Sequence, residues 1–252
     1  MKKLYEKSEL TFALVCIVIY CVLQSLANPL NKIIGIEGLA NAIFNVVLTV
    51  ILFCFIKKNG LFKRYGLCKT SIPARQFLYY VPLIILVTRN LWNGVTVNFS
   101  LTSTVCYITY MLCVGFVEEV LFRGFLFKAM AKDNVKMAIV ISSVTFGLGH
   151  LLHLINGSDV ELVANLFQVV GAIAFGFLFV LIFHRGGSLI PCIITHSVIN
   201  ASSAFANETG LTVEKRIIMN LILFVIIAVY TFILSKILPK NQHLNENGVA
   251  NK

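Results

Sequence analysis

Glu118, Glu119 and Arg123 are ionisable residues within a long apolar segment. Ionisable side chains inside a membrane helix are costly, so each is a candidate functional residue. Glu119 and Arg123 lie four positions apart with the acid first, which favours an ion pair within the helix. The two carboxylates point about 100° apart in a helix, so Glu118 is expected to stay freer and to take a proton from water. The alternative is a charged helix end that reaches the headgroups, and the apolar residues after Arg123 disfavour it.

Two further apolar segments carry histidine. Phe146 and His150 lie four positions apart and share a helix face, and the two glycines between them would let another backbone come close. His153 is expected near a helix end and is interpreted as a packing residue. His196 and Asn200 are also four positions apart. Such a pair can bind a metal ion together or polarise a carbonyl oxygen. The alternative for both segments is hydrogen bonding between packed helices.

The composition places these residues in a membrane. Of the 252 residues, 58% are hydrophobic and 13% are charged, and the mean hydropathy is +0.87. A soluble domain is nearer half apolar and a quarter charged. This excludes a soluble single domain, a disordered chain and a coiled coil, and it predicts an all-α, polytopic membrane protein. The seven cysteines show no paired spacing, so we interpret them as packing residues rather than disulfides or zinc ligands.

Uncharged stretches long enough to cross a bilayer predict about eight transmembrane helices. The third is the weakest, because it is short and contains Pro82, which we expect to kink it. The fourth is expected to start near Leu101 and to continue past Arg123. The other expected spans are 10–31, 38–56, 76–88 with an extension to Trp92, 137–155, 162–183, 188–206 and 217–235.

Positive charge is unevenly divided between the two sides that these helices define. Sixteen Lys and Arg residues fall on the side of the termini, and four fall on the other side: Lys32, Arg89, Lys215 and Arg216. Basic loops stay in the cytoplasm, so both termini are predicted to be cytoplasmic. The formal net charge of +10 therefore reflects orientation and contact with anionic membrane lipid, and it does not indicate nucleic acid.

Three motifs, in this order on three membrane helices, resemble those of the CPBP family: Glu118-Glu119-Val-Leu-Phe-Arg123, Phe146-Gly-Leu-Gly-His150 and His196-Ser-Val-Ile-Asn200. This is the family of CAAX-type intramembrane endopeptidases and of bacteriocin-processing or immunity (Abi) proteins. The resemblance covers roughly residues 104–205. The chain then divides into four segments: N-terminal transmembrane helices (1–103), a peptidase-like core (104–205), a C-terminal transmembrane helix (206–240) and a polar, disordered tail (241–252).

The resemblance implies an α-helical intramembrane peptidase whose site opens toward the cytoplasm. Carried over by position, it implies that Glu118 activates the attacking water and that His150 assists it or ligates a metal. His196 and Asn200 would bind the metal or stabilise the oxyanion, and Glu119 and Arg123 would support the site. A Zn²⁺ or another divalent ion would be held by Glu118, His150, His196 and Asn200. A glutamate–histidine hydrolase without metal is the open alternative.

The predicted function is therefore cleavage of a peptide bond in a membrane-associated protein or peptide. The small size and the Lys-, Asn- and Ile-rich composition are associated with bacterial members. That association points to a bacterial plasma membrane and to bacteriocin self-immunity or peptide maturation. Two alternatives stay open: a non-proteolytic immunity or scaffold protein, and a transporter or proton relay that uses the same charges. The substrate and the oligomeric state are left open.

Overall fold

The computed structural model describes residues 1–151 and 162–239, which form helices and no strand. Five described helices are long and apolar enough to cross a membrane: Glu9–Ile34, Leu39–Lys58, Leu101–Met130, Ala164–Gly186 and Val213–Ile237. The predicted all-α, polytopic fold is confirmed. His153 and the predicted tail, 241–252, lie outside the described residues.

Polar residues mark where several helices begin. Ser8, Ser100, Asn134 and Thr212 each accept a hydrogen bond from a backbone N–H in the first turn of the helix that follows. The elements are α1 (Lys2–Lys7), α2 (Glu9–Ile34), α3 (Leu39–Lys58), the 3₁₀ helix η1 (Ala74–Tyr80), α4 (Val81–Val87), the 3₁₀ helix η2 (Arg89–Leu91), α5 (Leu101–Glu118), the π-helix η3 (Glu119–Phe127), α6 (Lys128–Met130), α7 (Val135–Gly149), α9 (Leu162–Gly186), α10 (Ile190–Ser202), the 3₁₀ helix η4 (Ser203–Phe205) and α11 (Val213–Ile237).

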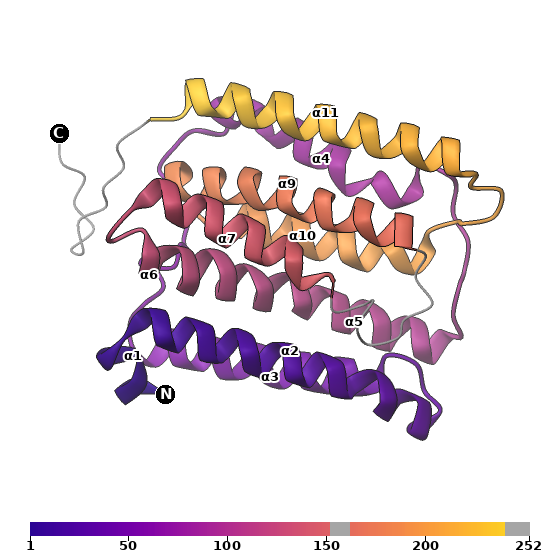
Figure 1. The fold of residues 1–252 in the computed structure, drawn as a ribbon, viewed down its shortest axis with the longest axis horizontal. Coiled ribbons are helices and arrows are strands. Elements are labelled where there is room, and N and C mark those ends of the chain that lie inside the picture. Colours follow the sequence, from indigo (N-terminus) through magenta and orange to yellow (C-terminus); the bar gives the residue numbers. More distant parts are fainter. Residues whose placement is uncertain (152–161, 240–252) are drawn as a thin grey trace.

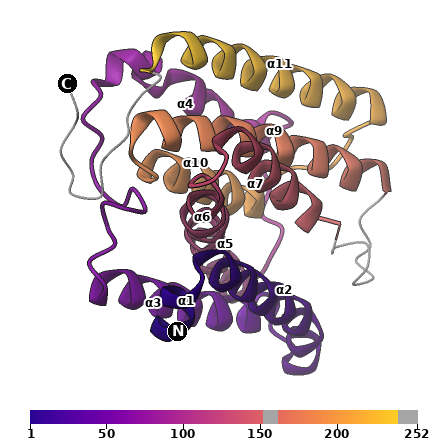
Figure 2. The ribbon, with the colours of Figure 1, turned by 60° about the vertical axis from the view of Figure 1, so that its left-hand side comes forward.

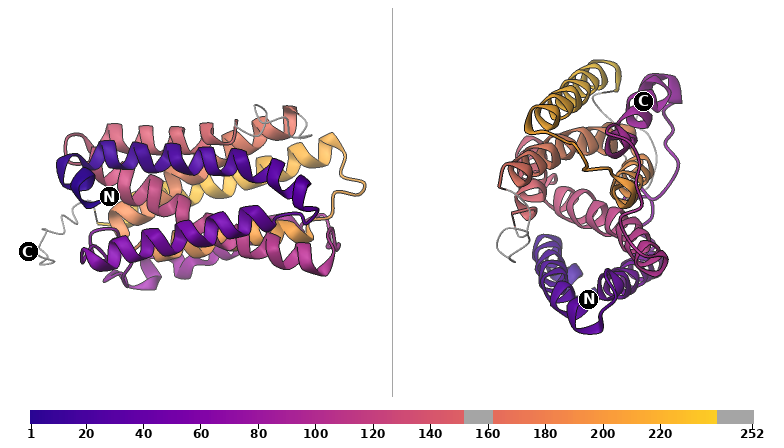
Figure 3. Two further views of the ribbon diagram at one scale, coloured as in Figure 1. Left: turned by 90° about the horizontal axis from the view of Figure 1, so that it is seen from below. Right: turned by 90° about the vertical axis from the view of Figure 1, so that its right-hand side faces the viewer.

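The long helices lie along one common axis in three tiers (Figure 1; Figure 3, left). One tier holds α1, α2 and α3, the middle tier holds α5, α7, α9 and α10, and the last holds α4 and α11. Figure 2 shows α2 and α3 as a pair beside the middle tier. α3 contacts α5, α2 contacts η3, and α11 contacts α9. The middle tier, which carries all three motifs, is therefore covered on both sides.

Most expected spans coincide with helices. The spans 10–31, 38–56, 162–183 and 217–235 correspond to α2, α3, α9 and α11. The helix expected from Leu101 past Arg123 is continuous through α5, η3 and α6. α7 and α10 have 15 and 13 residues and are shorter than expected. Part of the expected span 137–155 lies outside the described residues.

The third expected span is not one helix but three short pieces, η1, α4 and η2. Leu78, Tyr79 and Tyr80 have left-handed backbone angles, with φ of 50°, 52° and 60°. Residues with a side chain rarely adopt this conformation, and here it separates one helix from the next. Pro82 stands in the first turn of α4, where proline is tolerated, so the expected kink at Pro82 is wrong.

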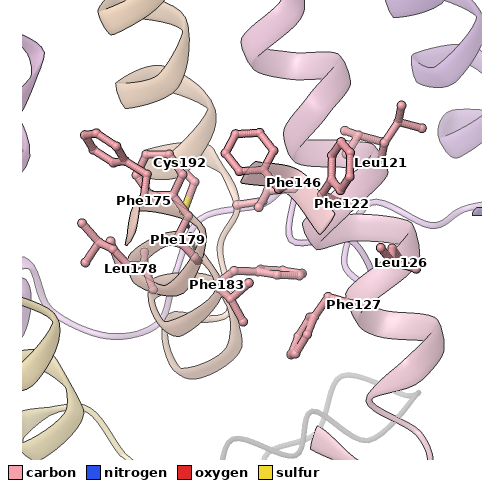
Figure 4. Packing of buried hydrophobic residues seen from close by; sticks show 14 of the residues in the cluster. Leu121, Phe122, Leu126, Phe127, Phe146, Phe175, Leu178, Phe179, Phe183 and Cys192 are labelled. Carbon is pink, nitrogen blue, oxygen red and sulfur yellow. Dashed lines mark hydrogen bonds between the residues drawn. The ribbon is translucent and has the colours of Figure 1, made fainter. Parts of the chain in front are cut away.

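Aromatic side chains fill the half of the bundle nearer the point where α1 begins and α11 ends, which we call the terminal end. The rings of Phe12 and Phe55 stack with their centroids 5.0 Å apart, and Phe125 lies 5.2 Å from Phe12 and 4.8 Å from Tyr65. Phe127 is fully buried beside this group. Figure 4 shows Phe127 with part of the surrounding apolar core. These five residues are called the aromatic plug below.

Candidate functional site

A π-helix carries the first motif. All nine residues of η3 are buried, and π-helical segments are rare and frequently occur at functional sites. Within η3, Arg123 Nη1 lies 3.1 Å from Glu119 Oε1, and both side chains are fully buried. The ion pair predicted from their spacing is confirmed. Removal of either partner would leave a buried charge unpaired. The ion pair therefore stabilises this conformation of η3.

His196 of α10 lies between the two glutamates. Its Nδ1 is 2.9 Å from Glu119 Oε1 and shares a hydrogen bond with that oxygen. Its Nε2 faces Glu118 Oε2 at 3.5 Å. One imidazole therefore joins both carboxylates, although α10 is more than seventy residues away in the sequence. The orientation of the ring is set by Glu119, as a carboxylate sets the tautomer of a functional histidine.

Glu118 has a partner that its sequence environment did not suggest. The hydroxyl of Tyr20, on α2, donates a hydrogen bond of 2.6 Å to Glu118 Oε1. The other oxygen, Oε2, is buried and accepts no hydrogen bond from the described residues. Glu118 is therefore less free than expected, but one of its oxygens is held while the other stays available. A tyrosine in an apolar helix normally indicates packing, so only the contact between the tiers reveals this role.

Phe146 lies at the centre of the charged groups. The guanidinium carbon of Arg123 is 3.9 Å from the centroid of the Phe146 ring, a cation–π contact. The rings of His150 and His196 each meet Phe146 edge-on, with centroids 5.6 Å away. The phenylalanine of the second motif thus positions groups from all three motif helices.

A cavity of about 490 Å³ adjoins these groups. Among the predicted site residues, Glu118, His150 and Asn200 line it. Glu119, Arg123 and His196 lie behind this lining and are buried. The structure therefore divides the six residues into three that face the cavity and three that support them. Tyr20 joins the first group, because it also lines the cavity.

The cavity lies in the half of the bundle away from the terminal end. From α2 it takes Tyr20 and Cys21, at the middle of that helix, and Gln24, Ser25 and Asn28 beyond the middle. From the far end of α7 it takes Phe146 and Gly149, with His150 directly after that helix. If both termini are cytoplasmic, as the sequence predicts, this placement puts the cavity nearer the opposite side of the membrane.

The two glycines of the second motif behave differently. A Cβ on Gly147 would overlap Ile173 Cγ1 and would meet backbone atoms of α9 at 3.0 Å, so the expected close approach is confirmed there. A Cβ on Gly149 would meet nothing within 4 Å. Gly149 instead lines the cavity beside His150. A closer contact that the sequence did not predict joins α5 and α10, where Gly115 packs against Ser197.

Part of the predicted metal set is arranged as ligands would be. Two ligands of a tetrahedral zinc ion, each at about 2.1 Å, are about 3.4 Å apart, which is close to the separation of Glu118 Oε2 and His196 Nε2, 3.5 Å. However, no three His, Cys, Asp or Glu residues in the described part of the chain form a group that could hold an ion. Glu118, His150 and His196 therefore do not form a three-ligand group by themselves, and a resident metal stays a prediction.

Comparison with known proteins supports the motif assignment. Residues 100–202 match the model of a family described as type II CAAX prenyl endopeptidase Rce1-like. No curated protein and no solved structure matches the chain. The matched segment holds all three motifs and the residues around Phe146, whereas Tyr20 lies outside it. The match over residues 100–202 is consistent with the CPBP family of CAAX-type membrane proteases, which the three motifs resemble.

Proposed function

We propose that the protein is an intramembrane endopeptidase that hydrolyses a peptide bond in the cavity, with Glu118 as the general base. The observation that carries this proposal is the pairing of Glu118, which lines the cavity, with the buried His196 directly behind it. Glu118 Oε2 and His196 Nε2 are 3.5 Å apart. An oxygen atom about 2.8 Å from both is geometrically allowed, so the two groups together can hold one water molecule.

The hydrogen bond from Tyr20 decides which carboxylate oxygen reacts. Oε1 is occupied by the Tyr20 hydroxyl, so Oε2 takes the proton as water attacks the carbonyl carbon. When the C–N bond breaks, the same proton passes from Glu118 to the leaving amine. Glu118 then returns to its starting state, and one water is consumed for each bond cleaved.

The oxyanion needs donors on the cavity wall. Asn200 lies one helical turn beyond His196 and lines the cavity, as does His150. The Asn200 amide and an imidazole N–H are suitable donors to the developing negative charge. Glu119 and Arg123 are positioning residues in this scheme, because they contact His196 and Phe146 rather than the cavity.

Cleavage by the purified protein in lipid vesicles tests the proposal. Candidate membrane peptides are incubated with the wild type, Glu118→Gln and the surface control Glu214→Gln. We expect Glu118→Gln to lower the rate by about 10²–10⁴-fold, the usual contribution of a general base, and Glu214→Gln to leave it unchanged. Equal cleavage by all three proteins would refute the peptidase. Immunity that survives Glu118→Gln in cells would instead favour a non-proteolytic immunity protein.

Bacteriocin processing or self-immunity is the biological role that we propose for this activity.

Whether cleavage requires a divalent ion is tested separately. The purified protein is treated with a chelator, dialysed and assayed with and without added Zn²⁺. Because the described residues contain no three-residue ligand group, we expect the rate to survive chelation. A loss that Zn²⁺ restores would establish the metal set predicted from the sequence.

A further inference from the structure

The cavity reaches the surface of the protein away from the terminal end. Asn28 of α2 and Gln168 of α9 line it and are exposed. Both belong to the halves of their helices that are remote from the terminal end. Glu118 and Phe122 form its floor, near the middle of the continuous helix Leu101–Met130. Among the described residues, the route from solvent to Glu118 therefore starts at the opposite end of the bundle.

The terminal end offers no comparable route in the described part of the chain. Below Glu118, every residue of η3 is buried. The aromatic plug lies on the same side, and its members come from α2, α3, η3 and the segment after α3. The rings of Phe12, Phe55, Tyr65 and Phe125 are in direct contact, Phe127 packs on Phe183, and close-packed rings leave no channel for water or a peptide.

Charge indicates which end is cytoplasmic. The loop between α3 and η1 alone carries Lys63, Arg64 and Lys69, and it lies at the terminal end. The opposite end carries four basic residues in all, of which Arg89 and Arg216 line the cavity. The excess of basic residues at the terminal end favours the cytoplasm for that end.

We propose that the cavity opens to the non-cytoplasmic side, so that its substrates are peptide segments on the outer surface of the membrane. The existence of a substrate rests on the proposed function. The side from which the cavity is reached does not depend on that function. Among the described lining residues, Glu118 is the one acid, whereas Arg89 and Arg216 are cationic, Arg216 being paired with Glu208 at 2.8 Å. A peptide segment with acidic groups near the cleavage point would match this wall.

Thiol labelling from each side of the membrane tests the direction. A charged, membrane-impermeant thiol reagent is applied to right-side-out and to inside-out vesicles, and peptide mass spectrometry identifies the modified residues. Each variant is the full chain with its native cysteines and one added cysteine as a reporter. Ser25→Cys lines the cavity, Thr209→Cys marks the loop at the opposite end, and Lys69→Cys marks the terminal end.

We expect Ser25→Cys and Thr209→Cys to react in right-side-out vesicles, and Lys69→Cys to react in inside-out vesicles. The native Cys21, which also lines the cavity, serves as a reporter that needs no substitution. Modification of Ser25→Cys only in inside-out vesicles would overturn the proposal, and so would its protection in both. Labelling requires no catalysis, so a protein that fails to cleave peptides but shows the expected pattern would refute the peptidase alone.

Discussion

Tyr20 shows how one side chain can complete a site from outside the three sequence motifs. Its hydroxyl is 2.6 Å from Glu118 Oε1, yet its helix, α2, lies outside the segment that matches the family. A hydrogen bond to a charged group contributes about 1.5–3 kcal/mol. Within the proposed mechanism, this bond orients the base and leaves one oxygen for the proton. Tyr20 therefore contributes to stability and, within the proposed mechanism, to the geometry of the base.

Tyr20→Phe removes that hydroxyl and keeps the ring. We expect the rate of peptide cleavage to fall by about tenfold or more and the stability to fall by about 1.5–3 kcal/mol, because Glu118 loses its hydrogen-bond donor while the aromatic packing remains. Tyr110→Phe is the matched control, since Tyr110 lines the same cavity from α5. Cleavage and thermal unfolding of both variants are measured in the same lipid vesicles. Equal rates for the two variants would show that the Tyr20 bond is structural only.

At the scale of elements, the contact between α5 and α10 sets the distance between Glu118 and His196. A Cβ on Gly115 would meet backbone atoms of Ser197 at 2.6 and 2.7 Å. Gly115 precedes Glu118 by three residues, and Ser197 follows His196 directly. Any widening at this contact would therefore separate the two groups that are proposed to hold the water. Small residues at helix crossings in membranes have this spacing role.

Gly115→Ala tests the spacing. We expect destabilisation of about 1–3 kcal/mol from overpacking, together with a loss of cleavage larger than the unfolded fraction explains. Gly171→Ala in α9 is the control, because its Cβ would lie 3.7 Å from the nearest atom, an ordinary contact. Denaturation midpoints and cleavage rates are compared for both. Full activity in Gly115→Ala would mean that α5 and α10 can separate without affecting the site.

The sequence predicted the helices better than the contacts between them. Apolar length located α2, α3, α9 and α11, because a bilayer demands uninterrupted apolar helix. Apolar length failed to predict the structure of 76–88, where three residues with left-handed backbone angles interrupt the helix. None of the three is a glycine, so the sequence gives no signal for the interruption. Spacing within one helix predicted the Glu119–Arg123 pair correctly. Spacing could not predict the hydrogen bond from Tyr20 to Glu118, because that bond depends on packing between tiers. It could not predict the π-helix either, because its apolar residues carry no local sequence signal.

At the scale of the whole molecule, the tier of α1, α2 and α3 is part of the site although the family match begins at residue 100. α2 contacts η3 and α3 contacts α5. Amide side chains tie α2 to α3: Gln24 donates to Asn45 Oδ1 at 3.1 Å, and Asn31 donates to Asn41 Oδ1. This tier therefore acts as one preformed wall of the cavity.

Division of the chain after Asn59 separates that wall from the rest. Gly60 follows α3 in an open turn, where a Cβ would meet nothing within 4 Å. Because preformed membrane helices associate through packing and polar contacts, we expect co-expressed fragments 1–59 and 60–252 to assemble and cleave peptide. Fragment 60–252 alone should be inactive, since it lacks the whole cavity wall that includes Tyr20. Activity of that fragment alone, measured after separate purification, would show that the first tier is dispensable.

The ring of Phe146 has a consequence for how this site can change over time. Arg123 stacks on its face, two histidines meet it edge-on, and one of those, His196, joins both glutamates. Effects of substitutions among residues in such contact are not additive. Loss of one member should cost nearly as much as loss of several, so double-mutant cycles across the ring should show strong coupling. Such coupling leaves few viable single-step replacements, so we expect the six residues of this contact network to be retained or lost together.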